Sequence, residues 1–278
     1  PSNANSATHT PDGSTTSQTA TYDSPLKLAA NGFTVPAGYT FNKWSSPKDL
    51  TTGDSATTQY SASTSINSWK VADDITLTAT WTPINYTITY QDTTSDSMGT
   101  ALYGSLTGSV PTPQTISYDN EVNLTSMTGT RTGYSFLGWS GDKNVRAVAG
   151  TGSLDYGNGE SVTYIYPGNA TLTAVWDPNI SGAITLNSNV YENNNTTTNP
   201  LYTSSTGVTP ATTSTIYSVY NNGLYKSLTP NKVSMVASEE KPTKTGYTFG
   251  GFYNSDMTTQ YITDAGVATD DGKRAVTS

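Results

Sequence analysis

The sequence predicts a mainly β chain built from three tandem modules, and three observations predict it. A Gly-Tyr-Thr/Ser-Phe motif occurs three times, at residues 38–41, 133–136 and 246–249. An aromatic residue follows each copy at the same offset, and these residues are Trp44, Trp139 and Phe252. Related alternating segments at 77–81 and 172–176 end in Trp, 37 residues after the motif Trp in both copies. Such a fixed spacing is typical of tandem copies of one folding unit.

The composition is consistent with small modules and narrows the function classes. The chain has 278 residues, and the repeat divides it into units of about 80–110 residues, an ordinary small-domain size. A net charge of −8 with only 13 Lys and Arg argues against a nucleic-acid partner. The absence of Cys excludes disulfides and thiolate metal sites. No run of residues is long and apolar enough to predict a membrane helix.

The middle unit shows the expected elements in order. Residues 86–90 alternate Tyr, Ile and Tyr with Thr and predict an opening strand. A second strand is expected near 115–124, and the motif segment 133–139 follows it. Further strands are predicted at 162–166 and 172–176. Since Thr lines one face of these segments, we expect a solvated antiparallel sheet.

The recurring aromatic residues are predicted to form the module cores. The chain has few aliphatic residues, and its 19 Tyr and 5 Trp supply apolar area in their place. A sugar-stacking platform is the alternative, but the rings lie on the inward face of alternating strands beside other large apolar residues. The predicted core rings are Tyr39, Phe41, Trp44, Trp81, Tyr134, Phe136, Trp139, Trp176, Tyr247, Phe249 and Phe252.

The third unit is longer than the second, and we expect its extra residues around 216–225. Tyr217, Tyr220 and Tyr225 flank Asn221-Asn222-Gly223 there, and Asn-Gly is a strong hairpin-turn signal. Because this segment lies outside the shared repeat, its three tyrosines are the candidate binding residues for a glycan or a host protein. The alternative is that the hairpin packs onto its own module.

The three motifs and two closing segments resemble the internalin-type B-repeat, also called the Listeria–Bacteroides repeat. Its pattern is an alternating opening strand, a Gly-Tyr-Thr-Phe-x-Gly-Trp motif, a variable loop and a closing Leu-x-Ala-x-Trp-type strand. The sequence departs from this pattern in its longer loops and in Phe252, which stands at the Trp position. The resemblance implies small β-grasp-like, sheet-rich modules that belong to large secreted or wall-attached bacterial surface proteins.

The predicted modules are 1–82, 83–178 and 179–278, and only the second is expected to be complete. Tyr22 matches Tyr118, yet it lies too near the beginning of the sequence to leave room for an opening strand like 86–90. In the third unit, a closing Trp placed 37 residues after Phe252 would fall beyond Ser278. We therefore expect the first module to lack its opening strand and the third its closing strand. Either the chain is a fragment, or neighbouring subunits donate the missing strands in a filament.

No catalytic site, metal site or cofactor is predicted. The only histidine is His9, in a Ser/Thr/Asn/Pro-rich stretch that offers no rigid second group to hold a catalytic imidazole. Residues 155–160 place Asp, Asn and Glu around two glycines and could bind Ca²⁺, although a surface turn is the alternative. We therefore expect a protein that is not an enzyme.

The expected function is a stalk or spacer in a secreted bacterial cell-surface adhesin. The alternatives are an extracellular binding module, acting through long loops or the Tyr hairpin, and a subunit of an extracellular filament. The expected partners are a protein or glycan on a host or neighbouring cell, or further copies of the chain through open sheet edges. The expected location is extracellular, at the bacterial surface.

Overall fold

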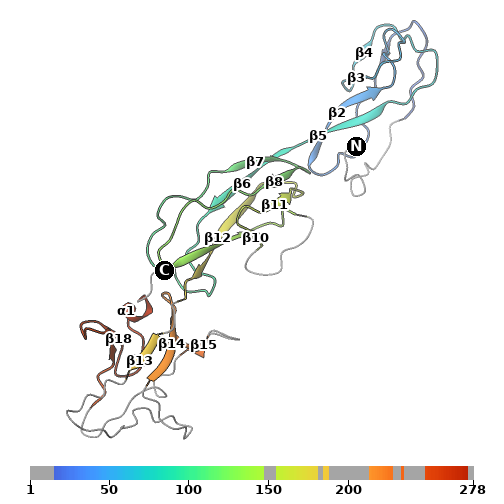
Figure 1. Cartoon of the computed structure of the whole chain (residues 1–278). Coiled ribbons are helices and arrows are strands. Elements are labelled where there is room, and N and C mark those ends of the chain that lie inside the picture. The colour runs from blue at the N-terminus through green and yellow to red at the C-terminus, as the bar shows by residue number, and fades with distance from the viewer. Residues whose placement is uncertain are drawn as a thin grey trace.

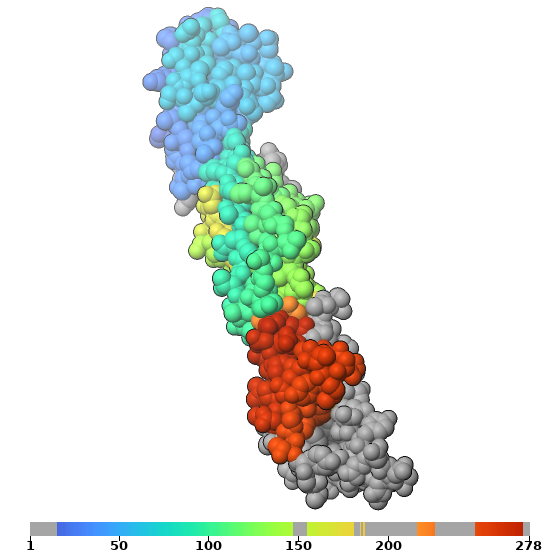
Figure 2. Space-filling view, turned by 90° about the vertical axis from the view of Figure 1, so that its left-hand side faces the viewer, coloured from blue at the N-terminus to red at the C-terminus, as the bar shows by residue number. Residues whose placement is uncertain are grey.

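The computed structural model describes residues 16–146, 155–180, 184–187, 213–227, 233–234 and 248–274. The protein is mainly β, as the sequence predicts, and consists of several small sheets. Three units follow one another along an elongated molecule (Figure 1). The space-filling view shows the same succession of units in a row (Figure 2).

The middle unit is built on a five-stranded sheet of order β10-β9-β12-β6-β7. Its strands are β6 (Asn85–Gln91), β7 (Gln114–Ser117), β9 (Tyr134–Gly141), β10 (Tyr156–Gly157) and β12 (Ala170–Pro178). A separate pair joins β8 (Glu121–Asn123) to β11 (Ser161–Thr163). The expectation of a purely antiparallel sheet is wrong, because β12 and β6 are parallel. A parallel pair needs a crossover of a dozen or more residues, and the long chain between β6 and β12 supplies it.

The strand expected near 115–124 is interrupted by a turn. β7 ends at Ser117 and β8 begins at Glu121. Between them Asp119 has φ 62°, and the N–H of Asn120 donates to the Ser117 carbonyl at 3.2 Å. Asp and Asn tolerate this left-handed conformation better than other side chains, so a Tyr-Asp-Asn sequence can reverse the chain where alternation alone suggests one strand.

The first unit repeats the strand pairing of the middle unit. Its strands are β1 (Leu26–Lys27), β2 (Tyr39–Ser46), β3 (Thr58–Tyr60), β4 (Ser65–Ile66) and β5 (Thr78–Pro83). They form a sheet of order β3-β2-β5 and the pair β1-β4. The phenol oxygen of Tyr60 accepts from the Leu50 N–H at 2.8 Å, as that of Tyr156 does from the Val145 N–H at 3.0 Å. Identical side-chain bonds at matching positions show that the two units share one chain path.

The third unit contains a four-stranded sheet and a short hairpin. The sheet follows the order β13 (Ile184–Asn187), β14 (Thr213–Val219), β15 (Gly223–Ser227) and β16 (Val233–Ser234). β17 (Phe252–Tyr253) pairs with β18 (Gln260–Ile262), and α1 (Asp270–Lys273) follows. The Thr269 hydroxyl caps α1 by accepting from the Gly272 N–H at 3.0 Å. The Phe252–Ile262 pairing corresponds to Trp139–Tyr156 in the middle unit.

The hairpin of Tyr220 is not an insertion, and this corrects the sequence interpretation. Tyr220 begins the turn between β14 and β15 just as Tyr118 begins the turn between β7 and β8. Asn221 has φ 55°, against 62° for Asp119. The additional residues therefore lie on either side of the hairpin, in stretches that include 188–212 and 235–247, outside the described residues.

A pair of aromatic rings from the motif is repeated in all three cores. The ring centroids lie 5.1 Å apart in Phe41–Trp44, 4.9 Å apart in Phe136–Trp139 and 5.1 Å apart in Phe249–Phe252. The interplanar angles of 60°, 67° and 68° are edge-to-face arrangements, which aromatic rings favour. The second ring of each pair is buried, and its exposed fraction is at most 9%. The motif thus contributes a ring pair to the core of each module, whereas Tyr39, predicted to be a core ring, packs on Tyr118 instead.

Trp81 departs from the predicted burial. Trp176, its counterpart, is 1% exposed and donates its indole N–H to Asp92 at 2.9 Å, whereas Trp81 is partly exposed. Asp92 directly follows β6, and the Arg131 guanidinium lies 5.8 Å from the Trp176 ring centre. The described part of the first unit contains no counterpart of β6 and the segment after it, so Trp81 lacks that cover.

The described residues of the third unit contain no counterpart of β12, although β13 corresponds to β6 in pairing with the strand before the Tyr turn. Within the described ranges the single helix is the four-residue α1. The β-grasp-like arrangement that the resemblance implies therefore remains a prediction.

Candidate functional site: the joints between modules

The first and second modules meet at a joint formed by Gly38, Tyr39, Ile84, Tyr118 and Asp119, called the first joint. Ile84 is the single residue between β5 and β6, and its N–H donates to the Gly38 carbonyl at 2.8 Å. Its carbonyl accepts from the Tyr118 N–H at 2.9 Å. The connecting residue is therefore hydrogen-bonded to the motif of one module and the tyrosine turn of the next.

The second and third modules meet in the same way, at a second joint of Gly133, Tyr134, Asn179, Tyr220 and Asn221. Asn179 donates its N–H to Gly133 at 2.9 Å and accepts from the Tyr220 N–H at 2.9 Å. The Tyr134–Tyr220 ring centroids lie 5.2 Å apart at 81°. In the first joint, Tyr39 and Tyr118 lie 5.3 Å apart at 75°.

Each joint places a tyrosine ring directly on a glycine. A Cβ added to Gly38 would lie 2.3 Å from the Tyr118 ring, and one added to Gly133 would lie 2.4 Å from the Tyr220 ring. Both glycines have positive φ, of 81° and 79°. The motif therefore needs glycine for the backbone turn and for the close approach of the next module.

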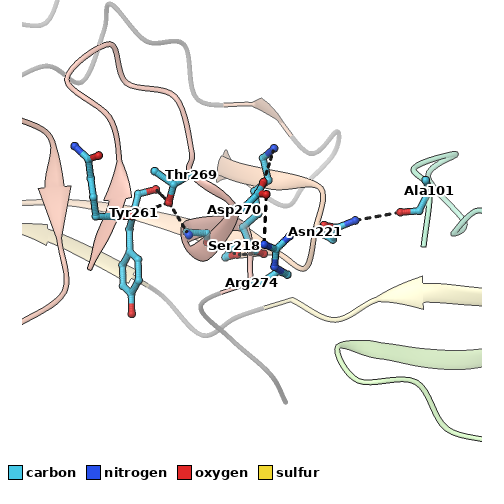
Figure 3. A network of polar contacts seen from close by, with 10 residues as sticks. Ala101, Ser218, Asn221, Tyr261, Thr269, Asp270 and Arg274 are labelled. Atoms are coloured by element: carbon cyan, nitrogen blue, oxygen red, sulfur yellow. Dashed lines mark hydrogen bonds and ion pairs between the residues drawn. The ribbon is translucent and has the colours of Figure 1, made fainter. Parts of the chain in front are cut away.

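The second joint carries an additional polar network from the loop after β6 (Figure 3). Asn221 donates its side-chain N–H to the Ala101 carbonyl at 3.1 Å, and Asn222 donates to Asp96 at 2.6 Å. The Arg274 guanidinium, just after α1, lies 4.1 Å from the Tyr103 ring centre and bonds Asn221 at 3.4 Å. These contacts join the middle module's loop to both the turn and the C-terminal helix of the third module.

The tyrosines of the joints have raised pKa values. Burial is the largest cause for Tyr118 and Tyr220. Burial and then the hydrogen bond that Tyr39 donates to Asp119, at 3.0 Å, raise the pKa of Tyr39 to about 12. The neutral phenol is the form that fits the joint.

A stability measurement at alkaline pH checks this hydrogen bond. An unfolded tyrosine ionises near pH 10, whereas Tyr39 in the folded chain has a pKa of about 12. Its contribution is therefore complete below about pH 10 and is lost as the pH rises towards about 12. We expect Tyr39→Phe to lose less stability than the native chain over this range in urea denaturation. Equal losses in both proteins would contradict the assignment.

The structure pairs two of the candidate binding residues, Tyr217 and Tyr225, across β14 and β15 and places the third, Tyr220, in the second joint. Tyr220 is 4% exposed in the second joint, Tyr225 is 6% exposed, and Tyr217 is partly exposed. Leu224 and Ile216, on the same hairpin, belong to the module core. A stacking shelf for sugars needs open ring faces, so the burial of Tyr220 and Tyr225 argues against it.

The acidic side chains of the possible Ca²⁺ site at 155–160 make contacts within the protein, and other candidate residues lie outside the described residues. The Asp155 carboxylate accepts from the Gly141 N–H at 2.9 Å, and the Glu160 carboxylate accepts from the Gly157 N–H at 2.6 Å and pairs with Arg146. Within the described ranges, no group of three or more acidic, His or Cys side chains could hold a metal ion. His9 and Tyr247 lie outside the described residues.

Sequence reasoning places module junctions at Pro83 and 177–179, but it assigned the motif to the cores alone and did not predict its contacts in the joints. A signal for them exists in the matching segments Gln-Thr-Ala-Thr-Tyr-Asp at 18–23 and Gln-Thr-Ile-Ser-Tyr-Asp at 114–119. The third copy, which ends in Val219-Tyr220-Asn221, keeps only the Tyr followed by Asp or Asn. This weak match conceals the equivalence of Tyr220 with Tyr118.

The comparisons with known proteins agree with the repeat architecture. The family model of the Listeria-Bacteroides repeat domain matches three segments of the chain, at residues 6–80, 86–175 and 216–272. No curated protein and no solved structure gives a significant match. In the described part, no helix is long and apolar enough to cross a membrane. Repeats of this family are typical of bacterial surface proteins. Because the matched segments cover most of the sequence, the chain belongs to the Listeria-Bacteroides repeat family.

Proposed function

We propose that the chain is a stalk or spacer segment of a secreted bacterial cell-surface protein of the adhesin type. The observation that supports this most directly is the repeated joint. Two joints with the same backbone hydrogen bonds and the same ring contact connect three modules in a row. Such connections convert a chain of small modules into an extended element that separates its two ends.

The joints suit a spacer because they leave little freedom between modules. One residue separates β5 from β6, and that residue is hydrogen-bonded to both neighbours. A flexible linker of Gly and Ser behaves instead as a random coil, whose end-to-end distance grows only with the square root of its length. The modules therefore hold a distal domain at a more constant distance from the cell surface than a linker of equal length does. A host or neighbouring-cell protein or glycan would then be contacted by that distal domain.

A surface-display experiment tests the spacer function. The chain is placed between a cell-wall anchor and a peptide tag on cells with a dense surface polymer, and antibody binding to the tag is measured. The control replaces the chain by a Gly/Ser linker of the same number of residues. We expect the native chain to give markedly more antibody binding at equal expression. Equal binding with the linker would show that the modular architecture does not set the reach.

A further inference from the structure

Among the described residues of the first module, no strand occupies the position that β6 has in the middle module, and this position is called the slot. In the middle module, β6 lies between two strands, antiparallel to β7 and parallel to β12. Its inward side chains are buried: Ile88 is 0% and Tyr90 is 4% exposed. Tyr90 packs against Trp139, with ring centroids 4.7 Å apart. β6 is thus an inner strand of the sheet, and its buried side chains belong to the core.

Both borders of this slot are present in the first module. The counterpart of β7 is 18–21, where the Gln18 side chain donates to the Lys27 carbonyl at 2.9 Å, as Gln114 does to Asn123 at 3.0 Å. The counterpart of the β12 segment that pairs with β6 is 75–78, because β5 and β12 have the same register against β2 and β9. Neither border is paired as a strand over residues 18–21 or 75–77.

The apolar side chains along the slot are less buried than their counterparts. In the middle module, Ala170, Leu172, Ala174 and Trp176 are 3%, 0%, 2% and 1% exposed. Their counterparts are all partly exposed, and these are Ile75, Leu77, Ala79 and Trp81. The four residues of the middle module are more buried because β6 and the loop after it contact them.

The tyrosine turn at the same end of the first module is also open. Tyr22 is 55% exposed, whereas Tyr118 and Tyr220 are 3% and 4% exposed in the joints. The turn itself is already formed, because Asp23 has φ 60° and its N–H donates to the Trp69 carbonyl at 2.8 Å. Asp119 makes the same bond to Tyr164 at 2.7 Å. The turn at Tyr22 therefore has the conformation of the turns in the two joints, but its ring is exposed.

We propose that this slot, bordered by 18–21 and 75–78, binds an extended segment with the Tyr-x-Ile-x-Tyr pattern of β6. The segment runs antiparallel to 18–21 and parallel to 75–78, as β6 does between its own neighbours. Its apolar side chains cover Leu77, the residue after the segment reaches Trp81 as Asp92 reaches Trp176, and its backbone pairs with the two open edges by strand addition. The residue that precedes this segment takes the place of Ile84, whose carbonyl accepts from the Tyr118 N–H. It would thus accept from the Tyr22 N–H and form a joint there.

Residues 1–15 of the chain do not have the apolar side chains that the slot requires. Residues 1–15 contain no Val, Ile, Leu, Met, Phe, Tyr or Trp and include Pro1 and Pro11. A second copy of the chain is also a poor donor, since its β6 is already paired on both sides. The occupant is therefore the opening strand of a further repeat module.

A peptide of residues 84–92, added to the full chain, tests the proposal. Trp81 is the only partly exposed tryptophan, since Trp44, Trp69, Trp139 and Trp176 are buried. We expect a saturable blue shift of tryptophan emission and slower hydrogen exchange at 75–78. The shift should disappear with Trp81→Phe and with a control peptide carrying Ile88→Asp. Leu77→Asp should abolish binding, whereas Thr76→Asp, at an exposed position beside it, should retain it.

A fusion provides a second measurement if the free peptide binds too weakly to detect. The same nine residues are joined ahead of Pro1, where residues 1–17 take the place of the 21 residues 93–113 of the middle module. Tethering raises the effective concentration to the millimolar range. We expect a higher melting temperature of the first module and a buried Trp81. The proposal fails if neither peptide nor fusion changes emission or exchange. It also fails if residues 75–78 are already protected by residues 1–15 or by dimerisation of the chain alone.

Discussion

Replacing Trp139 by alanine is expected to lower the free energy of unfolding of the middle module by about 3–5 kcal/mol. The Trp139 side chain is 0% exposed and contacts the rings of Phe136 and Tyr90, with centroids 4.9 and 4.7 Å away. Its removal leaves a cavity that β6, β9 and β12 cannot close without losing their pairing. Hydrogen exchange of the amides in β9 and β12 under increasing urea measures the effect on this module alone.

Two matched substitutions control this prediction. Trp81→Ala removes the same ring from a partly exposed position, so we expect less than half the loss. Trp139→Phe should cost less than Trp139→Ala, because Phe252 occupies this position in the third module with the same ring contact. In addition, no acceptor in the described part of the chain meets the buried Trp139 indole N–H, so phenylalanine removes an unsatisfied donor. A loss below about 1 kcal/mol for Trp139→Ala would contradict the core assignment.

Substitution of Gly133 by alanine is expected to open the second joint. The new methyl group would lie 2.4 Å from the Tyr220 ring, so the ring must leave the face of the middle module. The backbone φ of 79° adds a cost of about 1–2 kcal/mol for an L-residue. Fluorophores on cysteines introduced at Lys143 and Ser255 should report a broader distribution of distances between the second and third modules.

Gly99→Ala is the matched control for the joint. Gly99 has φ 82°, and no atom lies within 4 Å of the position that its Cβ would take. It therefore imposes a similar backbone strain, in the loop that carries Asp96 and Ala101 to the second joint, without displacing a tyrosine ring. We expect the distance distribution to remain that of the native chain. If both alanine variants broadened it equally, backbone strain rather than the ring contact would explain the effect.

The module cores could be predicted from the sequence because their signal is local and repeated. The ring pair lies within one seven-residue motif, so its spacing fixes which side chains meet in all three copies. The alternation at 86–90 and 172–176 likewise predicts β6 and β12. The parallel pairing of these strands was missed, since alternation is the same for parallel and antiparallel neighbours.

The joints and the exposure of Trp81 depend on contacts between distant segments. Tyr118 reaches Gly38 across 80 residues of sequence, and Tyr220 reaches Gly133 across 87. The segment around each joint tyrosine repeats clearly only at 18–23 and 114–119, and nothing in it indicates which glycine the ring contacts. The core and joint roles of the motif are therefore indistinguishable before the modules are placed side by side. Trp81 and Trp176 likewise share one sequence context, and their burial differs because Asp92 and Arg131 contact Trp176 alone.

One measurement tests most directly whether the joints hold the three modules as one extended element. The chain contains no Cys, so cysteines introduced at the exposed residues Thr57 and Ser255 accept a donor and an acceptor dye without competition. Single-molecule energy transfer between these ends then gives the distribution of end-to-end distances. We expect one narrow population at long distance, which Gly133→Ala broadens and Gly99→Ala does not. A broad distribution in the native chain, equal to that of Gly133→Ala, would contradict it.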